Sequence, residues 1–151
     1  MTIATRGKPS KNTSMKTLEK MQQLAAQPHS GYTQEGLIRK KEMHRQAKKF
    51  LRELAAMRGM AKGDYDLRSN MAGPAVSGEI TLHSDTLYVQ VGQSPFAIGG
   101  MSLLVRGCRG RGDYSGLTNH CLIFKSLDVG SLLDLLEDCH KEAVRSSQHV
   151  S

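Results

Sequence analysis

Between residues 80 and 125 the chain contains two pairs of short apolar runs. Residues 80–82 and 87–91 form the first pair, in which apolar and polar side chains alternate, separated by turn-forming residues 83–85. A period of two places successive side chains on opposite faces of a β-strand, so we expect a hairpin with one buried face. The apolar runs 101–105 and 121–124 form the second pair and are expected to be antiparallel strands. Residues 65–71 are expected to add another strand, followed by a turn at residues 73–74.

Helical periodicity precedes this strand-rich region. A short helix is expected after Ser14 and is ended by Pro28, and a longer helix should begin at the N-cap Thr33, reach about Ala61 and stop at Gly63. At 100° per residue, the longer helix has one apolar arc and one basic arc. The apolar arc comprises Met43, Ala47, Phe50, Leu51, Leu54, Met57 and Ala61. The basic arc comprises Lys41, Arg45, Lys48, Lys49 and Arg52.

A final helix is expected near residue 130. Either Asp128 or Ser131 can serve as its N-cap, and Ser131 with Asp134 has the form of a capping box. The leucine-rich stripe that follows should pack on the sheet. The sequence therefore predicts an α+β fold: N-terminal helices, one of them long, basic and amphipathic, then an antiparallel meander of four to five strands, then a C-terminal helix packed on the sheet.

The positive charge of the chain is concentrated in its N-terminal part. Residues 1–62 contain fourteen Lys and Arg against four Asp and Glu, whereas residues 63–151 contain seven against ten. We divide the chain into a disordered basic arm (1–14), a basic helical segment (15–62) and an α+β domain (63–151). Such a cationic segment attracts polyanions, of which nucleic acid is the commonest and an anionic membrane the next. The alternative is an ordinary solvated surface.

An arginine- and glycine-rich loop, residues 108–120, connects the second pair of strands. Glycines let backbone N–H groups approach an anion, arginine forks match phosphate geometry, and a tyrosine ring can stack on a base. The alternatives are a flexible connection that has no ligand and a site for a small phosphorylated ligand. The candidate nucleic-acid contacts in and beside the loop are Arg106, Arg109, Arg111, Tyr114, Asn119 and His120.

Other functional motifs are absent from the sequence. There is no phosphate-binding P-loop, and the loop glycines have the wrong spacing for a dinucleotide fingerprint. The pairs His120-Cys121 and Cys139-His140 lack a C-x-x-C partner, so we expect no metal, and we read Cys121 and Cys139 as small core residues. We expect no cofactor and assign no catalytic residue. An enzyme built around Asp113, Asn119 and His120 is the weakest hypothesis. His83 is expected to lie exposed in its turn, without a role.

The three cysteines are an odd number, and no apolar run approaches the roughly 18 residues needed to cross a bilayer. With no apolar N-terminal stretch resembling a signal peptide, we expect a cytoplasmic protein with reduced thiols and no membrane association.

Two segments carry a resemblance to a known group. Residues 75–90 form the hairpin segment, and residues 109–116 with Asn119-His120 form a glycine-arginine, Asp-Tyr, Ser-Gly, Asn-His loop. Together they resemble small proteins encoded on bacterial plasmids and integrative conjugative elements, over residues 65–127. The resemblance implies a bacterial mobile-element setting and no particular mechanism.

Two hypotheses follow for function. The first is a non-catalytic nucleic-acid-binding protein, with DNA favoured over RNA, that uses the basic helix and the Arg/Gly loop. The second is a protein–protein adaptor or regulator that presents Met43, Phe50, Leu54 and Met57 to a partner. The apolar arc of the longer helix is also compatible with a homodimer formed through that helix.

Overall fold

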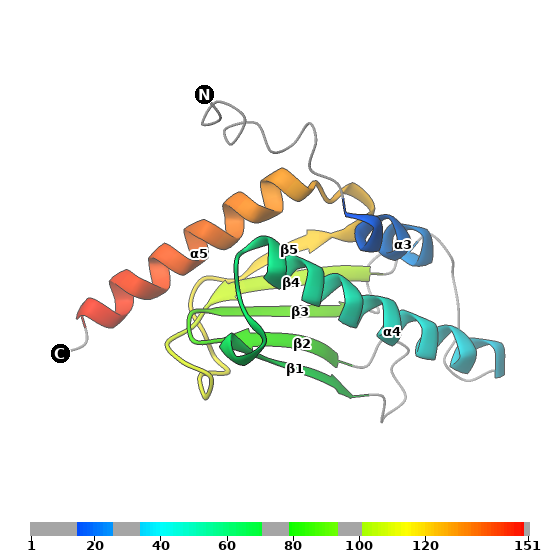
Figure 1. Cartoon of the computed structure of the whole chain (residues 1–151), viewed down its shortest axis with the longest axis horizontal. Coiled ribbons are helices and arrows are strands. Elements are labelled where there is room, and N and C mark those ends of the chain that lie inside the picture. The colour runs from blue at the N-terminus through cyan, green and yellow to red at the C-terminus, as the bar shows by residue number, and fades with distance from the viewer. Residues whose placement is uncertain (1–14, 26–33, 71–78, 94–100, 150–151) are drawn as a thin grey trace.

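The computed structural model describes residues 15–25, 34–70, 79–93 and 101–149 of the chain. Three α-helices and a five-stranded antiparallel sheet make up this part, and the strands follow one another in the order β1-β2-β3-β4-β5 (Figure 1). The predicted α+β fold is therefore confirmed, with five strands in the meander. The elements are α3 (Lys16–Ala25), α4 (Gln34–Met57), η1 (Lys62–Asp64), β1 (Tyr65–Asn70), β2 (Glu79–Ser84), β3 (Leu87–Gln93), β4 (Met101–Gly107), β5 (His120–Ile123), η2 (Phe124–Ser126) and α5 (Val129–His149).

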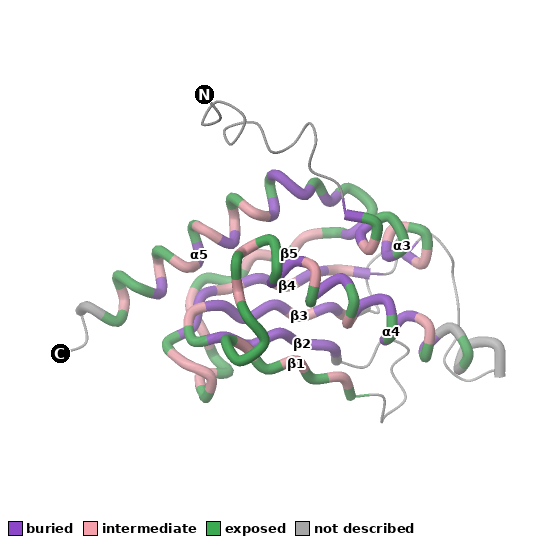
Figure 2. The backbone as a smooth tube through the Cα atoms, in the orientation of Figure 1, coloured by how far each residue is buried: buried purple, intermediate pink, exposed green. Residues whose placement is uncertain are grey.

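The helices all pack on the same face of the sheet. Leu67 pairs with Leu82, Leu82 with Val89, and Val89 with Val105, so one row of apolar side chains crosses the sheet on that face. Helix α4 contacts β1 and β2, α5 contacts β3 and β4, and α3 contacts α4 and η2. Figure 2 shows α4 buried along the side that faces the sheet. The opposite face of the sheet carries the alternate residues of each strand.

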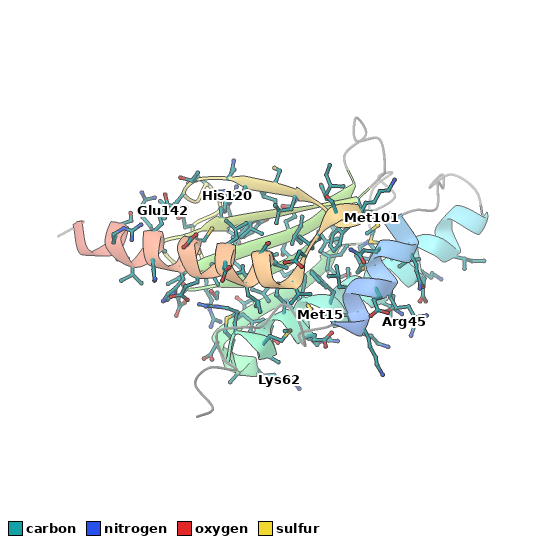
Figure 3. The ribbon with its side chains drawn as sticks, turned by 90° about the horizontal axis from the view of Figure 1, so that it is seen from above. Met15, Arg45, Lys62, Met101, His120 and Glu142 are labelled. Atoms are coloured by element: carbon teal, nitrogen blue, oxygen red, sulfur yellow. The ribbon has the colours of Figure 1, made fainter. Side chains whose placement is uncertain are left out.

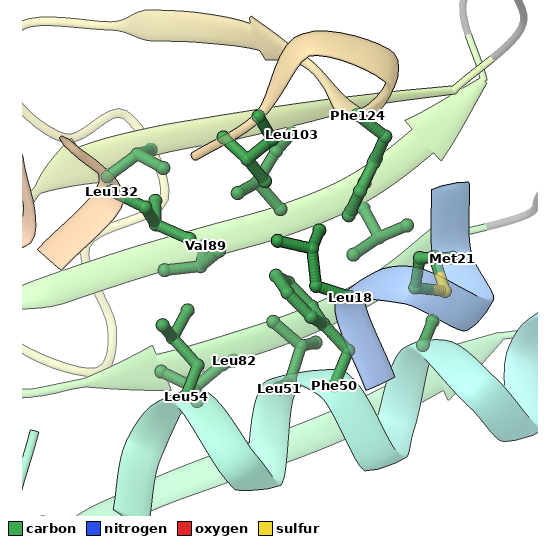
Figure 4. Close-up of a cluster of buried hydrophobic side chains, with 14 of the residues drawn as sticks. Leu18, Met21, Phe50, Leu51, Leu54, Leu82, Val89, Leu103, Phe124 and Leu132 are labelled. Atoms are coloured by element: carbon green, nitrogen blue, oxygen red, sulfur yellow. The ribbon is translucent and has the colours of Figure 1, made fainter. Parts of the chain in front are cut away.

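A single hydrophobic core joins the N-terminal helices to the sheet. The ring of Phe50 is fully buried and packs edge-on against that of Phe124, with centroids 5.3 Å apart. Leu18 of α3, Leu103 of β4 and Leu132 of α5 belong to the same cluster (Figure 4). The division between residues 62 and 63 therefore marks a change in composition, and the same core runs across it.

Helix α4 ends four residues earlier than the sequence predicted. Gly59 has φ +79°, and the N–H groups of Gly59 and Met60 donate to the carbonyls of Ala56 and Ala55. These two bonds form a Schellman motif, which needs a left-handed residue that glycine supplies at little cost. Gly59, and not Gly63, is thus the residue that ends the helix.

The apolar face of α4 is covered by the protein's own core. Met43, Phe50 and Leu54 are each at most 1% exposed, and only Met57 of the predicted partner-binding set is at the surface, at 36%. A partner could reach the three buried side chains only by displacing the core. This finding corrects the predicted adaptor surface, and it removes the apolar seam on which a homodimer through this helix would depend.

Helix α5 is capped by Asp128, the first of the two predicted N-caps. Its carboxylate accepts the Ser131 N–H at 2.9 Å, so the alternative with Ser131 as the cap is wrong. Gly107 lies where α5 crosses β4. A Cβ there would be 2.6 Å from the Cys139 carbonyl oxygen, so the close approach of helix and strand requires a glycine.

The first hairpin turns at Asp85 and Thr86, later than predicted. His83 and Ser84 belong to β2, and the Ser84 hydroxyl accepts the N–H groups of Thr86 at 3.2 Å and Leu87 at 2.9 Å. The predicted basic arm (1–14), the caps Ser14 and Thr33, the helix end at Pro28 and the turn at residues 73–74 lie outside the described residues. Among the described helices, none has the length and apolarity to cross a membrane.

Candidate nucleic-acid interface

The basic row of α4 faces away from the core. Lys41, Lys49 and Arg52 are exposed and Lys48 is half-buried. Arg45 is the exception in the row, because its guanidinium donates to the Glu42 carboxylate at 2.6 Å, and this bond lowers the pKa of Glu42. Between described residues, no ion pair engages the other four cations of the row. Four of the five predicted helix residues therefore present a positive charge that no ion pair between described residues neutralises.

A groove of about 510 Å³ lies between this basic face and the edge strand β1. Its lining residues come from α4, η1 and β1: Lys48, Arg52, Lys62, Tyr65, Asp66, Leu67 and Ser69. Sequence reasoning identified the two α4 cations and missed Lys62 and Tyr65. The helical period ends before Lys62, so only the fold brings it beside the row. Figure 3 shows Lys62 and Arg45 on the α4 side of the molecule and His120 beside Glu142 on the α5 side.

The Arg/Gly loop is tightly folded around Asp113. This carboxylate accepts the N–H groups of Arg109 at 2.9 Å and Gly116 at 3.0 Å, and the Ser115 hydroxyl at 3.0 Å. The Gly116 and Arg109 bonds, in that order, lower the pKa of Asp113 to about 2. Gly116 adopts φ +67°, and a Cβ there would lie 2.5 Å from the Arg106 side chain. These contacts argue against a flexible connection.

Arg111 ties the loop to the sheet. Its guanidinium lies 3.4 Å from the Asp66 carboxylate on β1 and 3.3 Å from that of Asp85 in the hairpin turn. It also donates to the Gly63 carbonyl at 2.6 Å. With two carboxylates already beside it, Arg111 is poorly placed to be a primary phosphate contact, and it fixes the loop against β1 and the hairpin turn.

A cluster of aromatic rings in edge-on contact anchors the loop to the open face of the sheet. The His83 ring packs edge-on against Tyr88 and Tyr114, with centroids 5.1 and 5.2 Å away, and its Nε2 donates to the Gly110 carbonyl at 3.0 Å. His83 is 4% exposed, and burial lowers its pKa. The expectation of an exposed, idle His83 is therefore wrong. Arg68 donates to the Tyr114 hydroxyl at 3.1 Å, while Tyr114 as a whole is 53% exposed.

Arg106 holds the two ends of the loop together. Its guanidinium lies over the Tyr88 ring, 4.4 Å from the centroid. The same group donates to Asn119 Oδ1 at 3.3 Å and to the Tyr114 carbonyl. Arg106 and Asn119 are therefore engaged within the loop, which assigns both residues a structural role in this conformation.

Arg109 and His120 lie toward α5. Arg109 Nε donates to the Ser146 hydroxyl at 3.1 Å, yet its side chain is 47% exposed. His120 lines a separate hollow of about 260 Å³ with Thr118, Asp138, Cys139, Glu142 and Arg145. Asp113 is not among these lining residues, so the predicted enzyme set is not gathered in one hollow. The structure likewise separates His120 from the groove beside α4.

The cysteines are free thiols in two different environments. Cys108 and Cys139 are buried, and burial raises the pKa of both, that of Cys139 to about 11. Cys121 is exposed, contrary to the expectation of a core residue, because it lies on the face of β5 away from the helices. Within the residues that the structure describes, no three His, Cys, Asp or Glu side chains are arranged to hold a metal ion.

Comparisons with known proteins identify no relative. No protein-family model matches the chain, and neither a curated protein nor a solved structure shows significant similarity to it.

Proposed function

We propose that this protein binds nucleic acid without catalysing a reaction on it, through the basic face of α4. The observation that carries the proposal is the row Lys41, Lys48, Lys49 and Arg52, which has no ion-pair partner between described residues and continues into the groove at Lys62. Unpaired cations along one face attract the phosphate backbone, and the release of counterions makes such binding salt-dependent. DNA is the favoured nucleic acid in this proposal. The resemblance of the hairpin and loop suggests only a bacterial mobile-element setting.

In this proposal fewer loop residues contact nucleic acid than the sequence predicted. Arg106 and Arg111 are engaged by the loop and by β1, so we assign them to holding the loop. Arg109 and Tyr114 are about half exposed and are the loop residues with surface left for a backbone or a base. Asn119 is engaged by Arg106 and His120 lies toward α5, so both are secondary candidates.

Fluorescence anisotropy tests the proposal. Labelled single-stranded DNA, duplex DNA and RNA are titrated with the protein at two salt concentrations. Lys48→Ala/Arg52→Ala should weaken binding about tenfold, since the substitutions remove two exposed charge interactions of about 0.7 kcal/mol each. Arg109→Ala should weaken it less. The charge-matched control is Lys125→Ala/Lys141→Ala, two exposed lysines away from α4, which should have no comparable effect.

Absence of binding to all three probes at low salt would refute the proposal. Equal losses of affinity in the α4 pair and the control pair would also refute it, because binding would then depend on net charge alone.

A further inference from the structure

We propose that the groove between α4 and β1 is a site for single-stranded nucleic acid, with phosphates on Lys48, Arg52 and Lys62 and a base against Tyr65. This inference rests on the proposed function and specifies the form of its ligand. The groove is open and about 510 Å³ in volume. Its cations come from two separate elements, so a strand lying in it would meet positive charge from α4 and from η1.

The α4 wall has the spacing of a backbone-tracking surface. Lys48 and Arg52 are four residues apart, which places them on the same helix face about 6 Å apart along the axis. Lys62 follows the helix end and belongs to η1, which leads directly into β1. Three cations in one groove provide several phosphate contacts without any conformational change of the helix.

The carboxylate of the one acidic residue among the described lining residues lies outside the groove. Asp66 pairs with His83 across β1 and β2, so its side chain is on the open face of the sheet, opposite Tyr65 and Leu67, and Arg111 from the loop lies 3.4 Å from it. The groove therefore presents its three cations without a facing carboxylate among the described lining residues.

The β1 side of the groove offers contacts that suit bases. β1 is the terminal strand of the sheet, and an edge strand presents backbone N–H and C=O groups outward. Tyr65 supplies an aromatic ring, on which a base can stack irrespective of sequence. β1 is held by its pairing with β2, and the 2.6 Å bond between His44 Nδ1 and Ser69 Oγ joins it to α4.

A single strand fits these walls better than a duplex does. Helices that read duplex DNA protrude into a major groove about 12 Å wide. α4 instead lies along the sheet, and its cations Lys48 and Arg52 line a recess. A duplex resting on the molecule would meet the exposed Lys41 and Lys49, whereas the bases of an unpaired strand are free to turn toward Tyr65.

The test compares two charge-matched pairs in the full chain. Lys48→Ala/Lys62→Ala removes groove cations, and Lys41→Ala/Lys49→Ala removes cations of the outer row. The probes are a labelled oligothymidylate of about a dozen nucleotides and a duplex of the same length. We expect the single strand to bind more tightly than the duplex. The groove pair should lower the salt slope for the single strand by about 1.4, and the outer pair by clearly less.

A second variant set tests the base contact. Tyr65→Leu keeps an apolar side chain but removes the ring, and should weaken single-strand binding at least about fivefold, while Tyr65→Phe should bind normally. Thermal unfolding of each variant verifies that it is folded.

The outcomes separate the two proposals. Tighter binding of the duplex, or equal effects of the two lysine pairs, would overturn the groove assignment while leaving nucleic-acid binding in place. Normal single-strand binding by Tyr65→Leu would overturn the base contact. Absence of binding to both of these probes would overturn this inference, and absence of binding to RNA as well would overturn the proposed function.

Discussion

The Asp113 turn makes the stability of the loop dependent on pH. Two backbone N–H groups and one hydroxyl donate to this carboxylate and hold its pKa at about 2, below its usual value of 3.8. A depression of that size corresponds to at most about 2.5 kcal/mol in favour of the folded loop. The Asp113 side chain is still 17% exposed, so water screens these interactions in part, and we expect about 1 kcal/mol.

The sign of the effect follows from the direction of the shift. Because the folded-state pKa is below the unfolded-state value, the stabilisation is complete above about pH 4 and is lost as the pH falls toward 2. Asp113→Asn keeps the shape of the side chain but removes its charge. We therefore expect the variant to be about 1 kcal/mol less stable than the wild type at pH 7, with a difference that narrows below pH 4.

Urea unfolding of both proteins between pH 7 and pH 3 measures this difference. Hydrogen exchange of the Arg109 and Gly116 amides, which donate to Asp113, reports loop opening when global stability changes little. Asp138→Asn, an exposed change on α5, is the matched control for removal of a negative charge. A stability difference that is absent at pH 7, or that stays constant down to pH 3, would refute the reasoning.

Three further predictions concern the core, a turn and a thiol. Phe50→Ala should cost about 3–5 kcal/mol in urea unfolding, because it empties a fully buried ring position; a cost below 1 kcal/mol would contradict the core described. Gly116→Ala should cost at least about 1 kcal/mol, since φ is +67° and a Cβ would meet a neighbouring side chain. Gly112→Ala, with open space around it, should cost less, and equal costs would count against this account. Cys121 should be alkylated at neutral pH well before Cys139, as mass spectrometry of timed samples can check; equal rates would argue against the burial of Cys139.

The regular elements of this fold could be predicted because their side-chain periods are local. The period of two indicated β2 and β3, short apolar runs indicated β4 and β5, and the helical period placed Met43, Phe50 and Leu54 on one buried face. The same pattern could not show what covers that face. The apolar face of α4 packs on the sheet, which follows later in the chain. The side chains that would have suited a dimer interface therefore form the core of a single chain.

Helix and turn boundaries were predicted less well, since several residues competed for each role. Gly59 and Gly63 are both suitable C-terminal stops, and the choice depends on which one closes the Schellman bonds. His83 has the composition of a turn residue, yet the loop that returns over the sheet buries it against Gly110 and Tyr114.

The candidate site also depends on contacts between residues that are far apart in the sequence. The charges of Lys48 and Arg52 are visible in the sequence, but the groove exists only because η1 and β1 return alongside α4. The loop arginines were predicted as ligand contacts from their type alone. The partners of Arg111, Asp66 and Asp85, are more than 20 residues away in sequence, so its engagement could not be read from spacing.

The most direct test of the central claim is the salt dependence of oligonucleotide affinity, because its slope counts the phosphates that the protein neutralises. The wild type is compared with a variant in which Lys41, Lys48, Lys49 and Arg52 are all replaced by alanine. If the basic face of α4 binds nucleic acid, the slope should fall by at least about 1.4, for Lys48 and Arg52 of the groove, and by about 3 where all four cations neutralise phosphates. A slope that is unchanged in the variant would contradict the claim, because the protein would then bind the phosphates elsewhere on its surface.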